Sequence, residues 1–155
     1  MTDKDIIIPL PENNESVLEG FIPYVMYRIT NRLNMDLQND LRPLKINVSR
    51  WRVLAALNAR DGRSMGELCH YTMMEQSSIS RVVDKMVEEG LVVRRVQEQD
   101  NRYILVYLTP KGRETFHLVY PKAYTRQDEA LKGFSEEERQ QLLAYLRRIE
   151  ENINI

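Results

Sequence analysis

The chain has 155 residues, of which 43% are hydrophobic and 29% charged, which is typical of one globular domain and excludes a disordered chain. It has a single cysteine, no apolar run of membrane-spanning length and no signal-peptide pattern in residues 1–5, so we expect a cytoplasmic protein without a membrane partner or an internal disulfide. The net charge of −1 excludes a chain that is basic throughout, but residues 42–113 carry 13 basic and 8 acidic side chains and lie between two acidic segments.

The N-terminal part of the chain predicts an arm followed by one long helix. Two prolines prevent a regular helix in residues 1–15, which we expect to form a flexible arm. A helix is predicted to begin between Ser16 and Pro23 and to end at Leu41, because a proline follows two positions later. Its apolar residues recur every four positions and therefore share one face: Val25, Ile29, Leu33 and Leu37.

Two shorter helices are predicted next. Asn47 is placed to cap a helix over residues 48–60, and Ser64 with Glu67 forms an S-x-x-E capping box at the start of the second helix. We expect the buried face of the first helix to consist of Trp51, Leu54, Ala55 and Leu57. We expect the buried side of the second helix to consist of Met65, Leu68 and Tyr71.

The strongest periodicity belongs to the helix that follows. Its apolar residues have the spacing i, i+3, i+4, i+7, i+8 of a single buried face: Ile79, Val82, Val83, Met86 and Val87. The opposite face carries polar and charged residues: Gln76, Ser77, Ser80, Arg81, Asp84 and Lys85. Small polar side chains near the N-terminal end and an arginine midway suit a helix that enters the major groove of DNA, although such a face on an isolated helix is more often simply solvated.

Two strands are predicted after Gly90, over residues 91–96 and 103–108, because both stretches are rich in β-branched and aromatic residues. They enclose a wholly polar linker over residues 97–102. Helix, turn, helix and hairpin in this order form the layout of a winged helix-turn-helix, and this region carries the positive charge of the chain, as a DNA-binding unit should. The predicted fold class is therefore mainly α with a small β wing.

The C-terminal part predicts two more helices. Thr109-Pro110 caps a helix that should run to about Gly133, with Pro121 expected to kink or interrupt it. Ser135 and Glu138 form a second capping box, which opens the last helix. The terminal helices have more apolar surface than one small winged unit can cover, so we expect a second copy of the chain to bury it.

The chain resembles the MarR family of bacterial winged helix-turn-helix transcriptional regulators over about residues 20–150. The resemblance rests on NVSRWRVL (47–54), MGEL (65–68), QSSISRVVDKM (76–86), GLV (90–92) and the wing signature Asp100-x-Arg102 followed by Leu108-Thr109-x-x-Gly112. One departure is Met73, at a turn position where the family often has glycine. The resemblance implies a ligand-responsive regulator, most often a repressor, that binds a palindromic operator in double-stranded DNA as a homodimer.

The resemblance also implies how the chain is divided. Residues 16–46 and 114–155 would form dimerisation helices with N- and C-terminal elements interleaved between two copies. Residues 47–113 would form the winged helix-turn-helix DNA-binding domain.

The candidate DNA-binding residues lie on the capped helix, the periodic helix and the hairpin: Ser64, Gln76, Ser77, Ser78, Ser80, Arg81, Lys85, Arg95, Asp100 and Arg102. We expect Ser77, Ser80 and Arg81 to approach bases. We expect Lys85 and Arg95 to contact phosphates, which position the protein without reading sequence.

The last two of these residues form a local pair at the tip of the hairpin. Arg102 is expected to enter the minor groove, where the negative potential favours an arginine, while Asp100 holds its side chain by a charge-assisted bond. The alternative is an ion pair that only shapes the turn.

A small-molecule effector site between the dimerisation helices and the winged unit is a further implication of the resemblance. In this chain it would be lined by Phe21, Tyr24, Arg28, Trp51, His117, Tyr120 and Tyr124. Aromatic rings with an arginine suit an aromatic carboxylate, a phenol or a coenzyme A thioester of such an acid. The alternative is that these aromatic side chains belong to the core.

The sequence gives little indication of metal binding, catalysis or redox sensing. Cys69, His70 and His117 lack metal-ligand spacing, so we expect no metal and no other cofactor. Neither histidine lies beside an evident nucleophile with an orienting acid, so we expect no enzyme. Two alternatives to the ligand-responsive DNA-binding regulator are a protein-binding winged helix and a redox-sensing regulator that acts through Cys69, although a cysteine of this kind is more often a small buried side chain.

Overall fold

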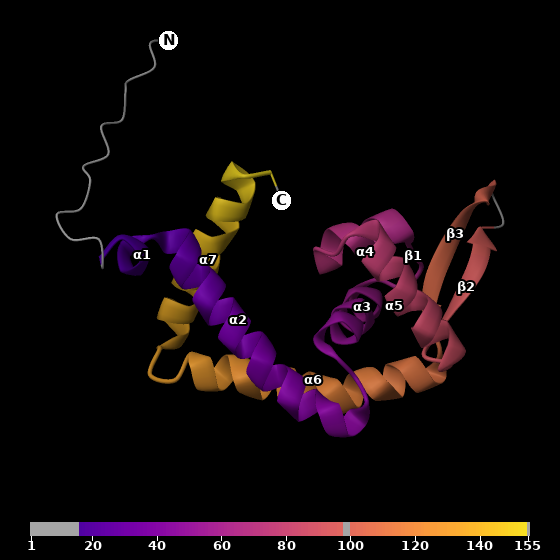
Figure 1. The fold of residues 1–155 in the computed structure, drawn as a ribbon, viewed down its shortest axis with the longest axis horizontal. Coiled ribbons are helices and arrows are strands. Elements are labelled where there is room, and N and C mark those ends of the chain that lie inside the picture. Colours follow the sequence, from indigo (N-terminus) through magenta and orange to yellow (C-terminus); the bar gives the residue numbers. More distant parts are fainter. Residues whose placement is uncertain (1–15, 98–99, 155) are drawn as a thin grey trace, which may run out of the picture.

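The computed structural model describes residues 16–97 and 100–154, without the side chains of Ser16 and of residues 97–103. The elements in chain order are α1 (Ser16–Gly20), α2 (Ile22–Leu41), η1 (Arg42–Leu44), α3 (Val48–Ala59), β1 (Arg63–Ser64), α4 (Met65–Thr72), α5 (Gln76–Glu88), β2 (Val92–Gln97), β3 (Asp100–Leu108), α6 (Pro110–Ala130) and α7 (Glu136–Asn152). Figure 1 shows α3, α4, α5 and the strands on one side, α1, α2 and α7 on the other, and α6 running beneath both. This architecture confirms the predicted class, mainly α with a small β wing.

The long N-terminal helix has the predicted extent. α2 begins at Ile22, with a proline in its first turn, where backbone N–H groups have no helical acceptor. At the other end the chain continues into η1 and then turns at Lys45, whose φ of 56° is left-handed. Leu37 and Leu41 are buried near this end, whereas Ile29 is 54% exposed. The apolar stripe of α2 is therefore only partly covered within one chain.

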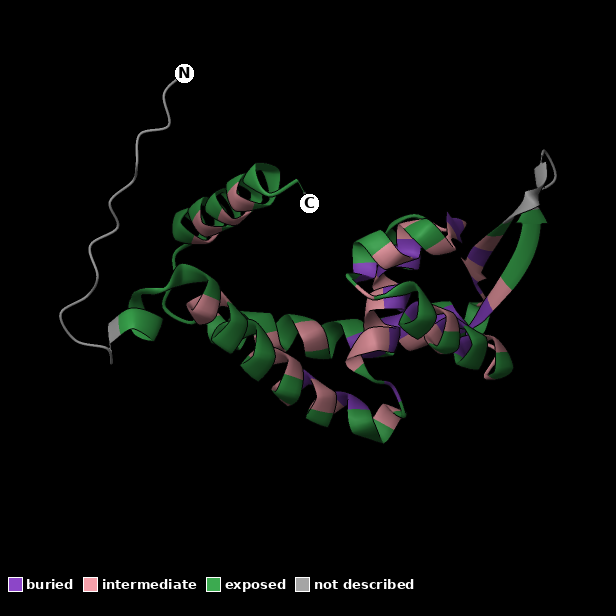
Figure 2. Cartoon of the chain, turned by 45° about the horizontal axis from the view of Figure 1, so that its top comes forward, coloured by how far each residue is buried: buried purple, intermediate pink, exposed green. Residues whose placement is uncertain are grey.

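The buried core lies around α3, which contacts α2, α4, α5, β3 and α6 (Figure 2). Leu54 and Leu57 are fully buried, as predicted. Trp51 and Ala55 are half-buried and pack against this core, and Val53, which was not predicted, is fully buried. Because α3 has neighbours on several sides, its buried surface is wider than the single stripe that a surface helix shows.

Tyr71 was also predicted wrongly. It is 58% exposed, and its ring lies over the guanidinium of Arg63 with the carbon of that group 3.8 Å from the ring centroid. Arg63 is only 4% exposed and donates from Nε to Ala56 O at 2.8 Å. The tyrosine ring therefore covers a buried cation, and the negative potential of the ring face attracts that cation.

The sheet is antiparallel, in the order β1–β3–β2. β1 was not predicted, because two residues are too few to show a periodicity of two. β2 extends to Gln97 and β3 begins at Asp100, so the connection is shorter than the predicted linker over residues 97–102. The hairpin register shifts between Val96 and Gln97, at the outer end of the wing.

The C-terminal helices carry little buried surface. Pro121 was predicted to kink or interrupt this helix; the interruption does not occur, because α6 continues as one helix through it. Pro121 is exposed, where water can satisfy the carbonyl that loses its N–H partner. α7 begins with the predicted capping box, in which Ser135 Oγ accepts from Glu138 N at 3.3 Å. No residue of α7, all of which the structure describes, is buried (Figure 2).

Among the described residues, no helix combines the length and the hydropathy needed to cross a membrane.

Candidate nucleic-acid interface

α5 presents an apolar face to the core and a polar face to solvent. Ile79, Val83 and Met86 are fully buried, as their spacing predicts. The candidate DNA-binding residues of this helix are exposed, apart from Ser80, which is half-buried: Gln76, Ser77, Ser78, Arg81 and Lys85. Neither cation of this set forms an ion pair with another residue that the structure describes, so both are free to meet an external anion.

The start and the end of α4 fix where α5 begins. Ser64 Oγ accepts from Glu67 N at 3.2 Å, and Glu67 Oε2 accepts from Ser64 N at 2.8 Å, which completes the predicted capping box. At the other end Met73 has φ 54° and ψ 40°, a left-handed conformation that glycine adopts without strain. The turn therefore keeps the geometry that favours glycine, even though this chain has methionine there.

The hairpin places two adjacent arginines on opposite faces of the sheet, because successive side chains of a strand alternate. Arg94 lies towards α5, and its Nη1 is 2.5 Å from Asp84 Oδ1. Arg95 lies on the other face, with its guanidinium carbon 5.3 Å from the centroid of the Tyr107 ring. Sequence reasoning selected Arg95 as a phosphate contact and could not tell which of the two arginines lies beside α5.

The wing-tip pair, Asp100 and Arg102, belongs to β3, but both side chains lie outside the described residues.

Several cations of the basic segment are used inside the fold. Arg50 is 8% exposed and donates to Lys45 O at 2.9 Å and to Glu89 Oε1 at 2.8 Å. Arg60 and Arg113 each pair with an acidic side chain nearby. These charges are neutralised within the fold. The excess of basic residues in the segment therefore overstates the number of cations that can contact DNA, and the exposed cations of α5 are more informative than that excess.

Four aromatic side chains of α3 and α6 form a continuous series, called the aromatic cluster below: Trp51, Phe116, Tyr120 and Tyr124. Ring centroids are 5.6 Å apart between Trp51 and Phe116, 5.6 Å between Phe116 and Tyr120, and 6.0 Å between Tyr120 and Tyr124. Phe116 is buried, whereas the two tyrosines are 48% and 52% exposed. Phe116 was not among the predicted effector residues, and its spacing of four from Tyr120 on one helix was the signal for a shared face.

The other predicted effector residues lie around this cluster to different degrees. His117 meets the ring of Phe116 edge-on at 5.6 Å. Tyr24 and Arg28 lie on α2, 5.9 Å apart between ring centroid and guanidinium carbon, and Phe21 precedes that helix. Within the described part of the chain, no ring contact joins these three residues to the aromatic cluster.

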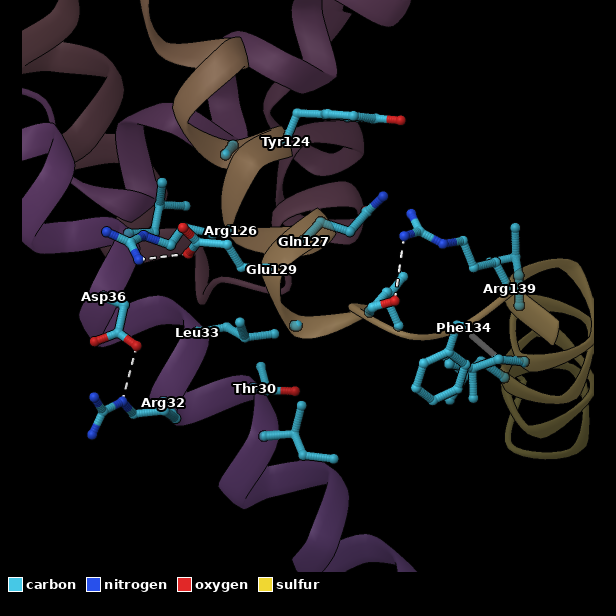
Figure 3. Close-up of a pocket in the computed structure, with 18 of the residues that line it drawn as sticks. Thr30, Arg32, Leu33, Asp36, Tyr124, Arg126, Gln127, Glu129, Phe134 and Arg139 are labelled. Carbon is cyan, nitrogen blue, oxygen red and sulfur yellow. Dashed lines mark hydrogen bonds and ion pairs between the residues drawn. The ribbon is translucent and has the colours of Figure 1, made fainter. Parts of the chain in front are cut away.

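An open groove of about 1530 Å³ lies between α2, α6 and α7 (Figure 3). Its lining is largely apolar, including Leu33 and Phe134, and it also contains Arg28 and Tyr124. The groove exceeds the roughly 300–1,000 Å³ of a typical small-molecule pocket. Its volume and its apolar lining therefore suit a protein segment better than a small ligand alone.

An ion pair joins the two long helices that border this groove. Arg126 on α6 donates from Nε and Nη2 to the two carboxylate oxygens of Asp40 on α2, at 2.6 Å and 2.9 Å. The hydrogen bond from Arg126 holds the pKa of the Asp40 carboxyl below its usual value.

Cys69 is half-buried on α4. Across residues 16–97 and 100–154, no group of three His, Cys, Asp or Glu side chains is placed to hold a metal ion.

Known proteins are similar to this chain in sequence and in fold. The profile of the MarR family matches residues 44–102. A MarR-family transcriptional regulator from Silicibacter pomeroyi, solved by crystallography, is 38% identical with a TM-score of 0.83, over 92% of this chain and 97% of that one. The transcriptional repressor IacR of Pseudomonas putida is 27% identical over 132 residues, 85% of this chain and 79% of IacR. BpsR of Bordetella bronchiseptica, whose DNA binding is regulated by 6-hydroxynicotinic acid, has the same fold with a TM-score of 0.74 and 22% identity, over 83% of this chain and 98% of BpsR.

Proposed function

The chain belongs to the MarR family of DNA-binding transcriptional regulators, and from this premise we propose that it is a repressor that binds a palindromic operator as a homodimer and leaves it when a small aromatic effector binds. The observation that carries the DNA part is the exposed face of α5, where Arg81 and Lys85 have no carboxylate partner among the described residues. A helix with this face fits the major groove, as the second helix of a helix-turn-helix does.

The residues of the interface divide by role. Ser77, Ser80 and Arg81 read base edges, because small donors and an arginine can form hydrogen bonds there. Lys85 and Arg95 bind phosphates, and Ser64, Gln76 and Ser78 position the two helices against the backbone. Arg102, oriented by Asp100, enters the minor groove.

The homodimer is supported by the terminal helices. α7 has no buried residue, and the groove between α2, α6 and α7 is open, with a lining that is largely apolar by area. Residues 16–46 and 114–155 form the dimerisation frame, and residues 47–113 form the DNA-binding domain. A second copy in the groove covers this surface and presents two α5 helices about 34–36 Å apart, the spacing of successive major grooves.

The effector is a small aromatic carboxylate, a phenol or a coenzyme A thioester of such an acid. The exposed rings of Tyr120 and Tyr124 offer stacking surface where α3 of the winged unit meets α6 of the frame. Arg28 lines the neighbouring groove together with Tyr124 and supplies a cation for a carboxylate. The regulation of BpsR by an aromatic acid and the repressor activity in the name of IacR support this class and this direction of control.

Fluorescence anisotropy with the DNA upstream of the chain's own gene tests the proposal. We expect saturable, salt-sensitive binding that exceeds binding to a scrambled duplex, and release after addition of an acid or thioester found in a thermal-shift screen. Tyr120→Leu should bind DNA like wild type and lose the response to the effector. If the chain showed no salt-sensitive binding to any genomic fragment, the proposed DNA binding would be refuted. A protein-binding winged helix would then remain as the alternative.

A further inference from the structure

The exposed face of α5 carries an acidic residue where DNA-binding helices gain affinity from cations. Asp84 follows Ser77 and Arg81 at helical spacings of seven and three, so the three side chains project on the same side of the helix. The Asp84 side chain is 51% exposed, and its carboxylate would lie near the phosphates of any duplex that α5 enters. A like charge there weakens sequence-independent binding, since that binding depends on cation–phosphate contacts.

Asp84 also holds an arginine of the wing. Arg94 Nη1 lies 2.5 Å from Asp84 Oδ1, with the arginine side chain 32% exposed. Arg94 is opposite Val106 in the hairpin, and Val106 is fully buried. The stem of Arg94 therefore continues the face of the sheet that packs on α5, and the guanidinium emerges next to the helix rather than on the far side with Arg95.

From this geometry we infer that Asp84 is a specificity-determining residue, which restrains Arg94 so that it does not bind phosphates on an arbitrary duplex. The inference rests on the proposed docking of α5 in the major groove. Without Asp84, Arg94 is a free cation on a long side chain beside the DNA-facing helix. It then adds one phosphate contact that carries no sequence information.

The same bond affects the operator complex in another way. Base reading by α5 and insertion of the wing must occur together on the operator, and the Asp84–Arg94 bond fixes the wing relative to the helix. A non-specific complex does not need this alignment. Loss of the bond therefore strengthens binding to any duplex through the freed cation, but on the operator the loss of alignment offsets this gain.

Glu88 provides a matched control. It is an exposed acid on α5, at a spacing of seven from Arg81, and it forms no ion pair with another residue that the structure describes. Asp84→Asn and Glu88→Gln each remove one negative charge from the same helix at nearly constant shape. Only Asp84→Asn releases an arginine.

The test measures binding of the full chain to its operator and to a scrambled duplex over a series of salt concentrations, for wild type, Asp84→Asn, Glu88→Gln and the double variant Asp84→Asn/Arg94→Gln. Asp84→Asn should bind the scrambled duplex roughly 5–10-fold more tightly near 0.1 M salt, with a salt slope steeper by about 0.9, the value of one added phosphate contact. Its operator affinity should rise less, so the ratio of the two affinities should fall. The double variant should lose the gain on the scrambled duplex.

Three results would overturn the inference. If Asp84→Asn gained equal affinity for both duplexes and Glu88→Gln did the same, the role of Asp84 would be simple repulsion of phosphates. Parallel losses on both duplexes with a lower melting temperature would make the ion pair a purely structural bond. Persistence of the gain in the double variant would show that Arg94 is not its source. A wild-type chain without preference for any duplex would instead contradict the proposed function itself.

Discussion

Replacing Gly112 by alanine is expected to destabilise the fold, although alanine normally favours a helix. Gly112 lies in the first turn of α6, and a Cβ there would meet Leu91 O at 2.0 Å and Leu108 Cδ2 at 3.1 Å. Non-bonded heavy atoms normally stay about 3.5–4.0 Å apart. The carbonyl of Leu91 cannot simply move, because it also accepts from Thr109 N at 3.1 Å. The glycine of the Leu-Thr-x-x-Gly signature is therefore needed for the close approach of α6 to the segment between α5 and β2.

The expected magnitude is the balance of opposing effects on the free energy of unfolding. Alanine gains about 0.5–1 kcal/mol over glycine inside a helix. Overpacking costs about 1–3 kcal/mol, and a weakened backbone hydrogen bond costs about 1 kcal/mol more. Since the added atom would contact backbone rather than a flexible side chain, we expect a net loss of roughly 2–3 kcal/mol, or a fall in melting temperature of about 4–12 °C.

Gly66→Ala is the matched control for this prediction. Gly66 also lies in a first helical turn, but nothing lies within 4 Å of the Cβ that alanine would add. This variant should gain up to about 1 kcal/mol. Urea unfolding followed by circular dichroism compares the variants at one protein concentration, because subunit association adds to stability. An unfolding midpoint for Gly112→Ala equal to or above that of wild type would refute the reasoning.

Three further predictions concern DNA binding and pH. Arg81→Ala should lose about 1–3 kcal/mol of binding free energy on the operator and relax the preference at one base pair per half-site. Lys85→Ala should instead weaken binding to all duplexes and flatten the salt slope by about 0.9. Similar behaviour of the two variants in anisotropy titrations would contradict the division of roles. Arg102→Ala should lose most operator affinity while unfolding stays within about 0.5 kcal/mol of wild type, and a loss of stability without loss of affinity would mark a turn-shaping role. Because Arg126 lowers the pKa of Asp40, this carboxylate stabilises the fold fully above its ordinary value of 3.8 and loses the effect as the pH falls through its lower folded value. Melting temperatures of Asp40→Asn should therefore lie below wild type at neutral pH and converge with it in acid, and a constant difference would contradict this account.

The features that the sequence predicted correctly depend on residues close together in the chain. The capping boxes of α4 and α7 each involve residues three positions apart, and the buried face of α5 follows from the helical period alone. The two strands of the wing were predicted from their β-branched and aromatic residues, and the MarR signature agrees with that prediction. Such local patterns depend little on the contacts that distant parts of the chain make.

The features that it missed depend on distant parts of the chain. The burial of Arg50 could not be predicted, because the carboxylate that accepts its hydrogen bond belongs to Glu89, far along the chain. The choice between Arg94 and Arg95 depends on the strand register, since one step moves a side chain to the other face of the sheet. The exposure of Tyr71 depends on a guanidinium that β1 brings beneath it. None of these contacts has a signal in the neighbouring sequence.

Hydrogen bonds at the C-terminal end of α5 join this helix, which is proposed to read DNA, to α3 and α6. Glu89 accepts from Arg50 of α3 at 2.8 Å through its carboxylate, and from Lys111 of α6 at 2.7 Å through its backbone oxygen. Thr109, the cap of α6, donates from Oγ1 to Gly90 O at 2.6 Å. α6 also carries most of the aromatic cluster where it packs on α3. If the proposed effector separated α6 from α3 at the cluster, it would strain the contacts that orient α5, and these contacts would connect the proposed effector site to the proposed DNA interface.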